Sequence, residues 1–400
     1  MSGTPDQLDA LLAIARADGR LAIDTEFMGE GRYRTLLCLI QLAVVETDDA
    51  EDPTLIVDPL DEDFDGRGLA DLLADPEIEI VVHAGRQDVA LLRRVLETEV
   101  TNLFDTQLAA GFAGMAAQAS YDSLLHEVLS LNLAKSASFT RWDQRPLSAE
   151  QIGYAREDVL HLLELADELQ RRLASLGRLE WAREECRALS LVSDAREPST
   201  IFERLPRVNS LGAGQRTVAR ELVAWRERTA ERQDRPVQSV LSDAGLVEVA
   251  KRRPASREQL SKLRGIGGSA QGRRAEELLG VVERARELPP QEAPDVPRTP
   301  SGRPEDAPLI ALSEALVRAR AREAGLAYEL LAARADLQAI VASARTGEAE
   351  PDVRTMRGWR RELVGKQVLE LLAGRVALSV DVSGEGRRLS VEDLEEEAER

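Results

Sequence analysis

The stretch Leu21-Ala-Ile-Asp-Thr-Glu-Phe27 is an apolar run that ends in two carboxylates one residue apart. An apolar run of this length is typical of a buried strand. Alternate side chains of a strand point to the same face, so Asp24 and Glu26 project together from one side of the sheet. Two like charges so placed repel each other. The pattern therefore predicts a positive partner, most simply a divalent cation with oxygen ligands.

Two later segments supply further oxygen ligands. The segment Glu79-Ile-Val-Val-His-Ala-Gly-Arg-Gln-Asp88 predicts a buried strand that runs into a helix, with Asp88 in the opening turn. The segment Tyr154-Ala-Arg-Glu-Asp158 predicts a helix, and a spacing of four places its hydroxyl and its carboxylate on one face. Either pattern alone is common in proteins without any metal. Four carboxylates and one tyrosine together are the parts of a two-metal phosphoryl-transfer site, with Mg²⁺ or Mn²⁺ as the two ions.

These motifs, in this order and at these separations, resemble the three exonuclease motifs of the DEDD superfamily, tyrosine subclass. Within that superfamily the chain is similar to the ribonuclease D family. The segments that carry this closer resemblance are Asp24-Thr-Glu-Phe27, Leu39-Ile-Gln-Leu42, Val57-Asp-Pro-Leu60, His83-Ala-Gly85, Phe104-Asp-Thr106 and Arg145-Pro-Leu147. The resemblance implies an α/β ribonuclease H-like 3′–5′ exonuclease domain, a mixed sheet flanked by helices, followed by all-α HRDC-type helical domains.

The strand pattern of the first half agrees with such a sheet. Runs near 20–26, 35–45 and 54–58 are joined by short connections, which favours an antiparallel meander. Runs near 79–84 and 102–105 alternate with helical segments, which suggests parallel additions. Ser148-Ala-Glu-Gln151 is a capping-box pattern, and it predicts the start of the helix that carries Tyr154 and Asp158.

The length of 400 residues exceeds what one core normally serves, so several domains are expected. Arg-rich helical segments near Arg235-Pro236 and Leu260-Ser-Lys-Leu-Arg-Gly-Ile266 resemble the HRDC domain, a module shared by RecQ-type helicases and ribonuclease D. The predicted divisions are an exonuclease domain over 1–200, an HRDC domain over 205–288, a proline-rich linker over 289–308, a second HRDC-like helical domain over 309–382 and an acidic tail over 383–400.

Matching the family motifs residue by residue implies a role for each ligand. Asp24 would bridge both ions, Glu26 and Asp158 would complete the site that activates a water, and Asp88 would hold the other ion through waters. Tyr154 would orient that water, because a phenol with a free pKa near 10 is a poor general base.

A wider set of residues is predicted to bind substrate around these ligands. For His83 a hydrogen-bonded structural role is an equal alternative, for Gln41 packing at the edge of the core is the alternative, and Asp105-Thr106 is interpreted as structural. The predicted substrate-binding residues are Thr25, Phe27, Met28, Gln41, His83, Arg141, Trp142 and Arg145, with weaker indications for Lys135 and Ser138.

The charge distribution suggests where a polyanion would bind. The formal net charge is −19, and residues 1–160 hold 30 acidic against 12 basic side chains. Residues 201–290 reverse this balance, with 18 basic against 12 acidic side chains. We therefore expect a basic face of the HRDC domain to tether RNA, while metal ions and local arginines offset the acidic catalytic domain.

Other features bear on location. No stretch approaches the roughly 20 apolar residues of a membrane span, so no membrane partner is expected. The N-terminus shows no secretory signal pattern. Cys38 and Cys186 are too few and too far apart for a disulfide framework or a cysteine metal site. A cytoplasmic monomer is the expectation.

The function implied by the resemblance is a metal-dependent 3′–5′ exoribonuclease. It would release 5′-mononucleotides from a single-stranded RNA 3′ end, with tRNA precursors or other stable RNAs as substrates. One alternative is a 3′–5′ DNA exonuclease of repair, because the motifs do not encode the choice of sugar. The other is a non-catalytic nucleic-acid-binding adaptor, against which the complete set of five motif residues argues.

Overall fold

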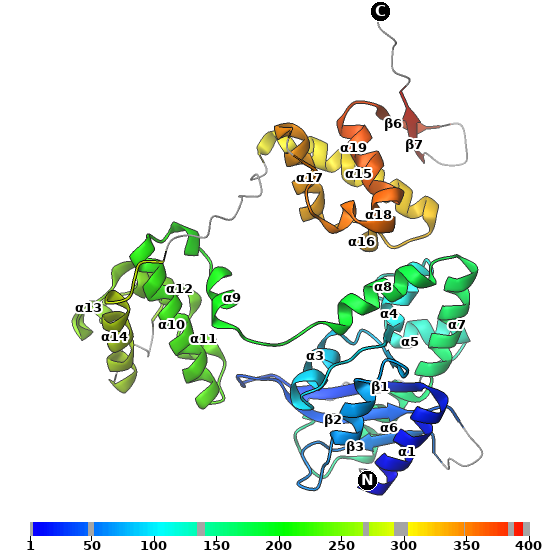
Figure 1. Ribbon diagram of the computed structural model, residues 1–400, viewed down its shortest axis with the longest axis horizontal. Coiled ribbons are helices and arrows are strands. Elements are labelled where there is room, and N and C mark those ends of the chain that lie inside the picture. The colour runs from blue at the N-terminus through cyan, green and yellow to red at the C-terminus, as the bar shows by residue number, and fades with distance from the viewer. Residues whose placement is uncertain are drawn as a thin grey trace, which may run out of the picture.

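The computed structural model describes residues 3–46, 52–133, 141–266, 272–291, 303–347, 349–382 and 388–394. Figure 1 shows three bodies: a sheet domain (residues 3–190), a central helical domain (residues 198–286) and a C-terminal helical domain (residues 303–394). Much of the predicted linker and of the predicted acidic tail lies outside the described residues. Among the described residues, we find no helix with the length and apolar character needed to cross a membrane.

The sheet has the mixed topology that the sequence predicts. Its strand order is β3-β2-β1-β4-β5, with β1–β2 and β2–β3 antiparallel and β1–β4 and β4–β5 parallel. The strands are β1 (Arg20–Met28), β2 (Leu36–Ala43), β3 (Thr54–Val57), β4 (Glu79–Val82) and β5 (Leu103–Asp105).

Strand β1 extends past its parallel neighbour. Only Arg20, Leu21 and Ala22 pair with β4, so the part of β1 that carries Asp24 and Glu26 has an open edge on that side. This opening beside the end of β4 is where side chains from other elements can reach the strand.

Helices cover both faces of the sheet (Figure 1). One face packs Ile23, Ile40 and neighbouring residues against α1 (Pro5–Asp18), α2 (Arg67–Leu73) and α3 (Arg86–Val95). The other face packs against α4 (Thr106–Phe112), α6 (Ala149–Leu160) and α7 (Leu162–Ser175). The remaining helices of the sheet domain are α5 (Tyr121–Leu124), the π-helical turn η1 (Leu125–Leu129) and α8 (Leu179–Ser190).

Two helices of this domain differ from what the sequence indicates. The helix that starts at the Ser148 capping box ends before His161, and α7 begins directly after that residue. Helix α4 was not expected, because its small residues show little periodicity. It begins at a cap instead, since the Asp105 side chain accepts hydrogen bonds from the backbone N–H groups of Gln107 and Leu108.

The central helical domain has a core of its own. The side chains of Phe202, Trp225, Leu246 and Leu278 belong to one buried cluster. Its helices are α9 (Pro198–Glu203), η2 (Val208–Ser210), α10 (Ala213–Arg232), α11 (Val237–Val240), α12 (Asp243–Arg252), α13 (Arg257–Ser261) and α14 (Gly272–Arg286).

The C-terminal helical domain ends in an unexpected hairpin. The sequence predicts helices followed by a frayed acidic tail, but β6 (Val376–Asp381) and β7 (Arg388–Asp393) pair antiparallel. The preceding elements are η4 (Pro304–Asp306), α15 (Ala307–Ala324), α16 (Tyr328–Leu331), α17 (Arg334–Thr346), η5 (Arg354–Met356), α18 (Gly358–Arg360), η6 (Arg361–Gly365) and α19 (Lys366–Leu372).

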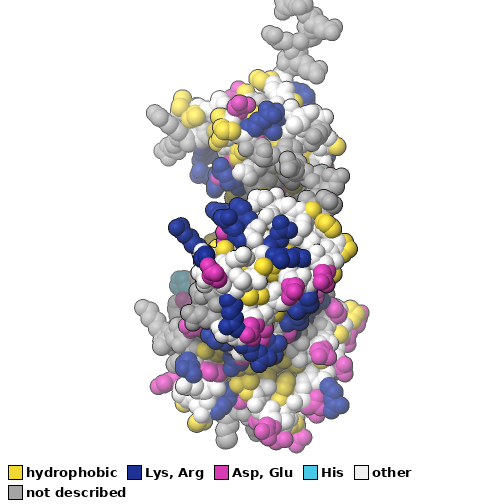
Figure 2. Space-filling model, turned by 90° about the vertical axis from the view of Figure 1, so that its left-hand side faces the viewer, with side chains coloured by type: hydrophobic (Ala, Val, Ile, Leu, Met, Phe, Trp, Pro, Cys, Tyr) yellow, Lys and Arg dark blue, Asp and Glu magenta, His cyan; other side chains and the backbone are white. Residues whose placement is uncertain are grey.

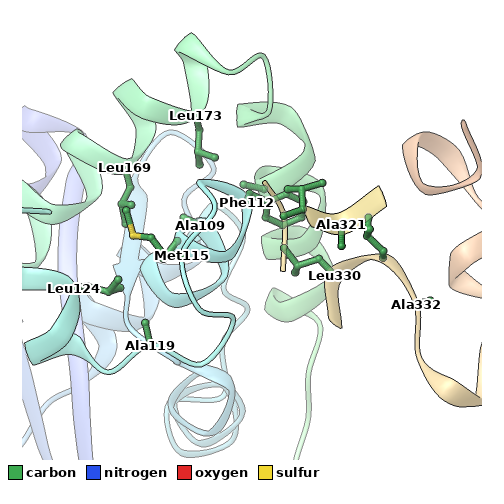
Figure 3. Packing of buried hydrophobic residues seen from close by; sticks show 14 of the residues in the cluster. Ala109, Phe112, Met115, Ala119, Leu124, Leu169, Leu173, Ala321, Leu330 and Ala332 are labelled. Atoms are coloured by element: carbon green, nitrogen blue, oxygen red, sulfur yellow. The ribbon is translucent and has the colours of Figure 1, made fainter. Parts of the chain in front are cut away.

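This domain packs on the sheet domain through a continuous apolar core. The indole rings of Trp181 and Trp359 stack with centroids 4.6 Å apart and planes 6° from parallel. Figure 3 shows Phe112 beside Leu330 and Ala321, from helices of the two domains. Arg178 of the sheet domain donates a hydrogen bond across the same boundary to the carbonyl of Gly325 (3.0 Å), and another within its own domain to the carbonyl of Phe112 (2.9 Å).

The central helical domain meets the sheet domain through polar contacts. The turn between β1 and β2 projects Tyr33, whose hydroxyl donates to the Glu227 carboxylate (3.1 Å) and whose backbone N–H donates to Asp234 (3.1 Å). Arg32 pairs with Asp234 (2.9 Å), and Arg196 pairs with Glu227 (2.7 Å).

Residues 192–194, which lead into the central helical domain, are held against the sheet domain by an ion pair and hydrogen bonds. The carboxylate of Asp194 pairs with Arg94 of α3 (2.7 Å), and its carbonyl accepts from Arg34 (2.6 Å). The carbonyl of Val192 accepts from Arg93 of the same helix (2.8 Å). Two elements that carry predicted metal ligands, β1 through its turn and α3, are therefore bonded to this segment.

Candidate active site

Three of the predicted metal ligands meet at the open edge of β1. One carboxylate oxygen each from Asp24, Glu26 and Asp158 lies within 4.8 Å of the other two. Helix α6, which carries Asp158, packs on the same face of the sheet from which Asp24 and Glu26 project. The arrangement offers a cation three oxygen ligands from two elements.

The start of α6 is fixed in the way that the sequence predicts. The Ser148 hydroxyl accepts from the Gln151 N–H (3.1 Å), and the Gln151 side chain accepts from the Ser148 N–H (3.0 Å). This confirms the capping box. One turn later, the Tyr154 hydroxyl donates a hydrogen bond to the Asp158 carboxylate, as their spacing of four allows.

The fourth carboxylate, Asp88, approaches from the opposite face of the sheet. It lies in the first turn of α3 and is buried, with 7% of its surface exposed. The Thr25 hydroxyl, which points away from the Asp24 face, donates a hydrogen bond to it. Asp88 is outside the group of three. After burial, however, its negative charge is the largest contribution to the raised pKa of Asp24, ahead of the charges of Asp158 and Glu26.

The electrostatics of this site favour the binding of cations. Burial raises the pKa of Glu26 to about 8, with a further contribution from the charge of Asp158. Burial likewise raises the pKa of Asp158 to about 7, and the pKa values of Asp24 and Asp88 also rise for that reason. Carboxylates that repel one another in a half-buried site are stabilised as anions by divalent cations. The four residues therefore fit the ions that the sequence predicts.

The Tyr154 hydroxyl is protonated in this arrangement. Burial raises its pKa, and the negative charges of Asp158, Glu26 and Asp24 raise it further. A phenol in this state donates hydrogen bonds and cannot accept a proton as a base. The hydroxyl therefore acts through hydrogen bonds in this structure.

Two of the predicted substrate-binding residues, Trp142 and Arg145, make contacts within the protein. Trp142 is 2% exposed and packs beneath Tyr154 in a cluster with Cys38 and Leu39. Arg145 directs all of its N–H groups into the protein: to the Asp58 carboxylate and to the carbonyls of Trp142, Gln144 and Cys38. The polarity of this loop suggested contact with substrate, but the loop turns both side chains inward.

Thr25 and Gln41 are also enclosed. Thr25 is 4% exposed, and its hydroxyl donates a hydrogen bond to the Asp88 carboxylate. Gln41 pairs with Asp24 across β1 and β2 and is fully buried. Neither polar atom of its amide has a hydrogen-bond partner in the described part of the chain. Buried amides without a protein partner are commonly satisfied by a bound water or ligand.

The other predicted contacts keep some exposure. Phe27 and Met28 are half-buried just past the carboxylates, and Arg141 is exposed and pairs with Asp143 (3.0 Å). His83 is half-buried with its Nδ1 atom 2.9 Å from the Thr106 hydroxyl, and burial lowers its pKa to about 4, so it is neutral. Lys135 and Ser138 lie outside the described residues.

One neighbour of the site, Tyr121, belongs to none of the sequence motifs. The Tyr121 ring lies 5.6 Å from that of His83, and its hydroxyl accepts from the backbone N–H of His161 at the end of α6 (3.2 Å). Burial raises its pKa, and the charges of Asp158 and Asp24 contribute. Its place at the first position of a short helix carries no motif that could reveal it.

Comparison with known proteins now places the chain. Residues 1–174 match the 3′–5′ exonuclease family, and residues 215–282 match the HRDC domain. Ribonuclease D of Granulibacter bethesdensis is 37% identical, with 94% of this chain and 93% of that protein covered. Ribonuclease D of Gluconacetobacter diazotrophicus is 36% identical, with 94% of each covered. The chain belongs to the ribonuclease D family.

The solved structures agree with this assignment. The fold matches that of Escherichia coli RNase D, an exoribonuclease involved in structured RNA processing, with a TM-score of 0.78 and 29% identity over 94% of this chain and 98% of that one. As in ribonuclease D, a mixed-sheet exonuclease domain is followed by an HRDC helical domain. The function is that of a 3′–5′ exoribonuclease, and neither the DNA exonuclease nor the adaptor is favoured.

Proposed function

We propose that the chain shortens single-stranded 3′ ends of RNA one nucleotide at a time, by hydrolysis at two divalent cations. The observation that carries this proposal is the convergence of Asp24, Glu26 and Asp158 within 4.8 Å, with Asp88 adjacent. Asp24, Glu26 and Asp158 would hold the cation on the water side of the scissile phosphate. Asp24 and Asp88 would hold the second cation.

Bound divalent cations would supply an activated water and would offset the charge on the departing 3′-oxygen. The chain's own residues have simpler tasks. Asp158 accepts the hydrogen bond of Tyr154 and so fixes the phenol at the edge of the ligand group. Because the one hydrogen of the hydroxyl is used by Asp158, the Tyr154 oxygen would accept a hydrogen bond from the attacking water and so orient it. Thr25 holds the Asp88 carboxylate, and Phe27 and Met28 offer half-buried surface to the terminal nucleotide.

The central helical domain is the proposed RNA tether. Its region holds 18 basic against 12 acidic side chains, and Figure 2 shows Lys and Arg side chains gathered across the middle of the molecule. Arg207, Arg252, Lys262 and Arg264 line one open groove of this domain. Basic side chains along a groove bind phosphates without reading sequence.

The substrate class follows from the same features. A basic RNA-binding domain next to a site for a free 3′ end suits a folded RNA with a single-stranded tail, such as a tRNA precursor. Escherichia coli RNase D, which shares this fold, acts in structured RNA processing. We propose that the C-terminal helical domain is a second HRDC-like domain and that the protein acts as a monomer.

A matched pair of substrates tests the proposal. RNA and DNA hairpins with identical 3′ tails, labelled at the 5′ end, are incubated with Mn²⁺, Mg²⁺ or EDTA. We expect an RNA ladder that shortens stepwise from the 3′ end, with no ladder in EDTA. Asp158→Asn should abolish shortening, whereas Glu150→Gln, an exposed residue on the same helix, should leave it intact.

Each contrary outcome has a definite meaning. Turnover by Asp158→Asn or by Asp24→Ala would contradict the assigned metal site. Preferred shortening of the DNA would keep the site and overturn the substrate. Arg252→Glu together with Arg264→Glu should weaken binding of the RNA hairpin and lower the steepness of its salt dependence. Unchanged binding by this double variant would contradict the groove as the tether.

A further inference from the structure

Asp105 does more than cap the helix that it precedes. Its Oδ1 atom accepts from the N–H groups of Gln107 (2.8 Å) and Leu108 (3.0 Å), as a helix cap does. Its Oδ2 atom accepts from the N–H of Gly85 (2.9 Å), and Oδ1 is also 3.3 Å from the N–H of Ala84. One buried carboxylate thus joins the start of α4 to a turn about twenty residues earlier in the chain.

That turn determines where Asp88 lies. Gly85 is the residue before α3, and its side-chain position provides no cap for that helix. Asp88 follows in the first turn, three residues on. The direction in which α3 leaves the sheet, and with it the position of the Asp88 carboxylate, depends on the conformation of residues 83–85.

The conformation of this turn is not one that the chain adopts readily. Ala84 has a φ of 54°, in the left-handed region that an L-residue with a Cβ atom seldom occupies. A Cβ atom on Gly85 would lie 2.6 Å from the Val82 side chain, so the backbone passes very close to the end of β4. Such conformations persist when surrounding groups hold them, and the hydrogen bonds from Ala84 and Gly85 to Asp105 do so here.

A neighbouring side chain reinforces the same corner. The Thr106 hydroxyl donates to the carbonyl of Val82 (3.0 Å), the last residue of β4, and lies 2.9 Å from Nδ1 of His83. Asp105 and Val82 are paired across β4 and β5. The corner between β5 and α4 therefore holds the whole segment from the end of β4 to the start of α3.

We propose that Asp105 is a positioning residue for Asp88: its second carboxylate oxygen fixes the Ala84–Gly85 turn, and that turn sets where Asp88 meets the cation. The inference rests on the proposed role of Asp88 as a metal ligand. Groups that orient metal ligands typically contribute about 10- to 100-fold in metal affinity.

The chemistry of the cap allows the two roles of Asp105 to be separated. Asn and Ser cap helices about as well as Asp does. Neither supplies the second anionic oxygen that Gly85 needs, because Asn places an NH₂ group there and Ser places nothing. Asp105→Asn and Asp105→Ser should therefore keep α4 and lose the hold on the turn, whereas Asp105→Ala should lose both.

Calorimetric titration of the full chain with Mn²⁺ alone, without substrate, tests this. We expect Asp105→Asn and Asp105→Ser to weaken one Mn²⁺ binding event by at least about tenfold, with melting temperatures closer to wild type than that of Asp105→Ala. In an Asp88→Asn background, Asp105→Asn should add no further loss, because both changes act through one ligand. Ser256→Ala, which removes the cap of α13 in the central helical domain, is the matched control.

Two results would overturn the positioning role. The first is wild-type Mn²⁺ binding by Asp105→Asn and Asp105→Ser while Asp88→Asn loses binding. The second is a loss of Mn²⁺ affinity on Asp105→Asn that is equally large in the wild-type protein and in the Asp88→Asn background. If Asp88→Asn itself binds Mn²⁺ like the wild type, the proposed ligand set fails instead, and that outcome is distinguishable from both.

Discussion

The Tyr154 phenol lies over the buried indole of Trp142, with ring centroids 6.0 Å apart and planes inclined by 36°. Trp142 lies in the loop before α6 and packs on β2, so it forms a floor under the tyrosine. The position of the Tyr154 hydroxyl therefore depends on a buried residue of the loop before its helix.

Replacing Trp142 should affect both the stability of the fold and the turnover of RNA. Trp142→Ala removes a large side chain with 2% exposure and should destabilise the fold by about 3–5 kcal/mol. It should also lower kcat, since Tyr154 loses its support. Trp142→Phe should retain most of both properties. Chemical unfolding and single-turnover RNA cleavage measure the two effects. Full kcat in a folded Trp142→Ala protein would show that Tyr154 needs no such support.

The acidic site should make the metal-free protein less stable as pH rises. The pKa of Glu26 is raised to about 8 and that of Asp158 to about 7, so the folded chain holds protons that the unfolded chain has lost. Stability is then lost as pH rises through these values. Buried His83, with a pKa lowered to about 4, acts in the opposite direction only below about pH 6.5, where an unfolded histidine takes up its proton.

Thermal unfolding in EDTA between about pH 6.5 and 8.5 measures this effect. We expect the melting temperature to fall across that range and Mn²⁺ to raise it more at the upper end, because the cation binds the deprotonated ligands. Asp158→Asn should flatten the pH profile in EDTA. A melting temperature that rises with pH in EDTA would contradict the raised pKa values.

The contacts that hold residues 192–194 against the sheet domain should control the position of the central helical domain. Asp194→Ala removes the pair with Arg94 and should increase the radius of gyration measured by small-angle scattering. Cleavage of a short single-stranded oligonucleotide should stay unchanged, while KM for an RNA hairpin should rise. Glu197→Gln, an exposed neighbour whose side chain caps no helix, is the control. An unchanged scattering profile for Asp194→Ala would show that the remaining contacts suffice.

The apolar contact between the sheet domain and the C-terminal helical domain should stabilise both domains. Trp359→Ala removes the stack on Trp181 and the edge contact with Phe112. We expect a loss of roughly 3 kcal/mol, as for other large-to-small changes of packed aromatic residues. Intrinsic tryptophan fluorescence during urea unfolding measures it. If the midpoint stays at the wild-type value, the two domains are stable without this contact.

The spacing of polar residues along strands and helices was enough to predict which side chains of the proposed site share a face. Asp24 and Glu26 share a face because they are two residues apart on β1, and Tyr154 and Asp158 share a face because they are four apart on α6. These periodicities are properties of the backbone and hold whatever surrounds the element. The antiparallel and parallel strand pairs followed from connection lengths in the same way.

Residues in loops could not be placed so well. Trp142 and Arg145 precede α6 in a polar segment, and no local period says which of its side chains turn inward. Arg145 is fixed by Asp58, which is 87 residues away in the sequence, so its role depends on a long-range contact. The β6–β7 hairpin was missed for a related reason. Its two short strands pair with each other in a sheet of their own, and few of their side chains, such as Val376, Leu378 and Val391, reach the core.

The core shared by the sheet domain and the C-terminal helical domain also affects folding during synthesis of the chain. Every proposed metal ligand has been synthesised by residue 158, yet the apolar face near Phe112 and Trp181 waits for Leu330 and Trp359. At the usual rates of translation, roughly 10–30 s separate the end of α8 from those residues. During that time the central helical domain emerges and folds around its own core. A newly made chain therefore contains all of its proposed metal ligands before its apolar flank can be covered, and during that time the flank is exposed to chaperones and to aggregation.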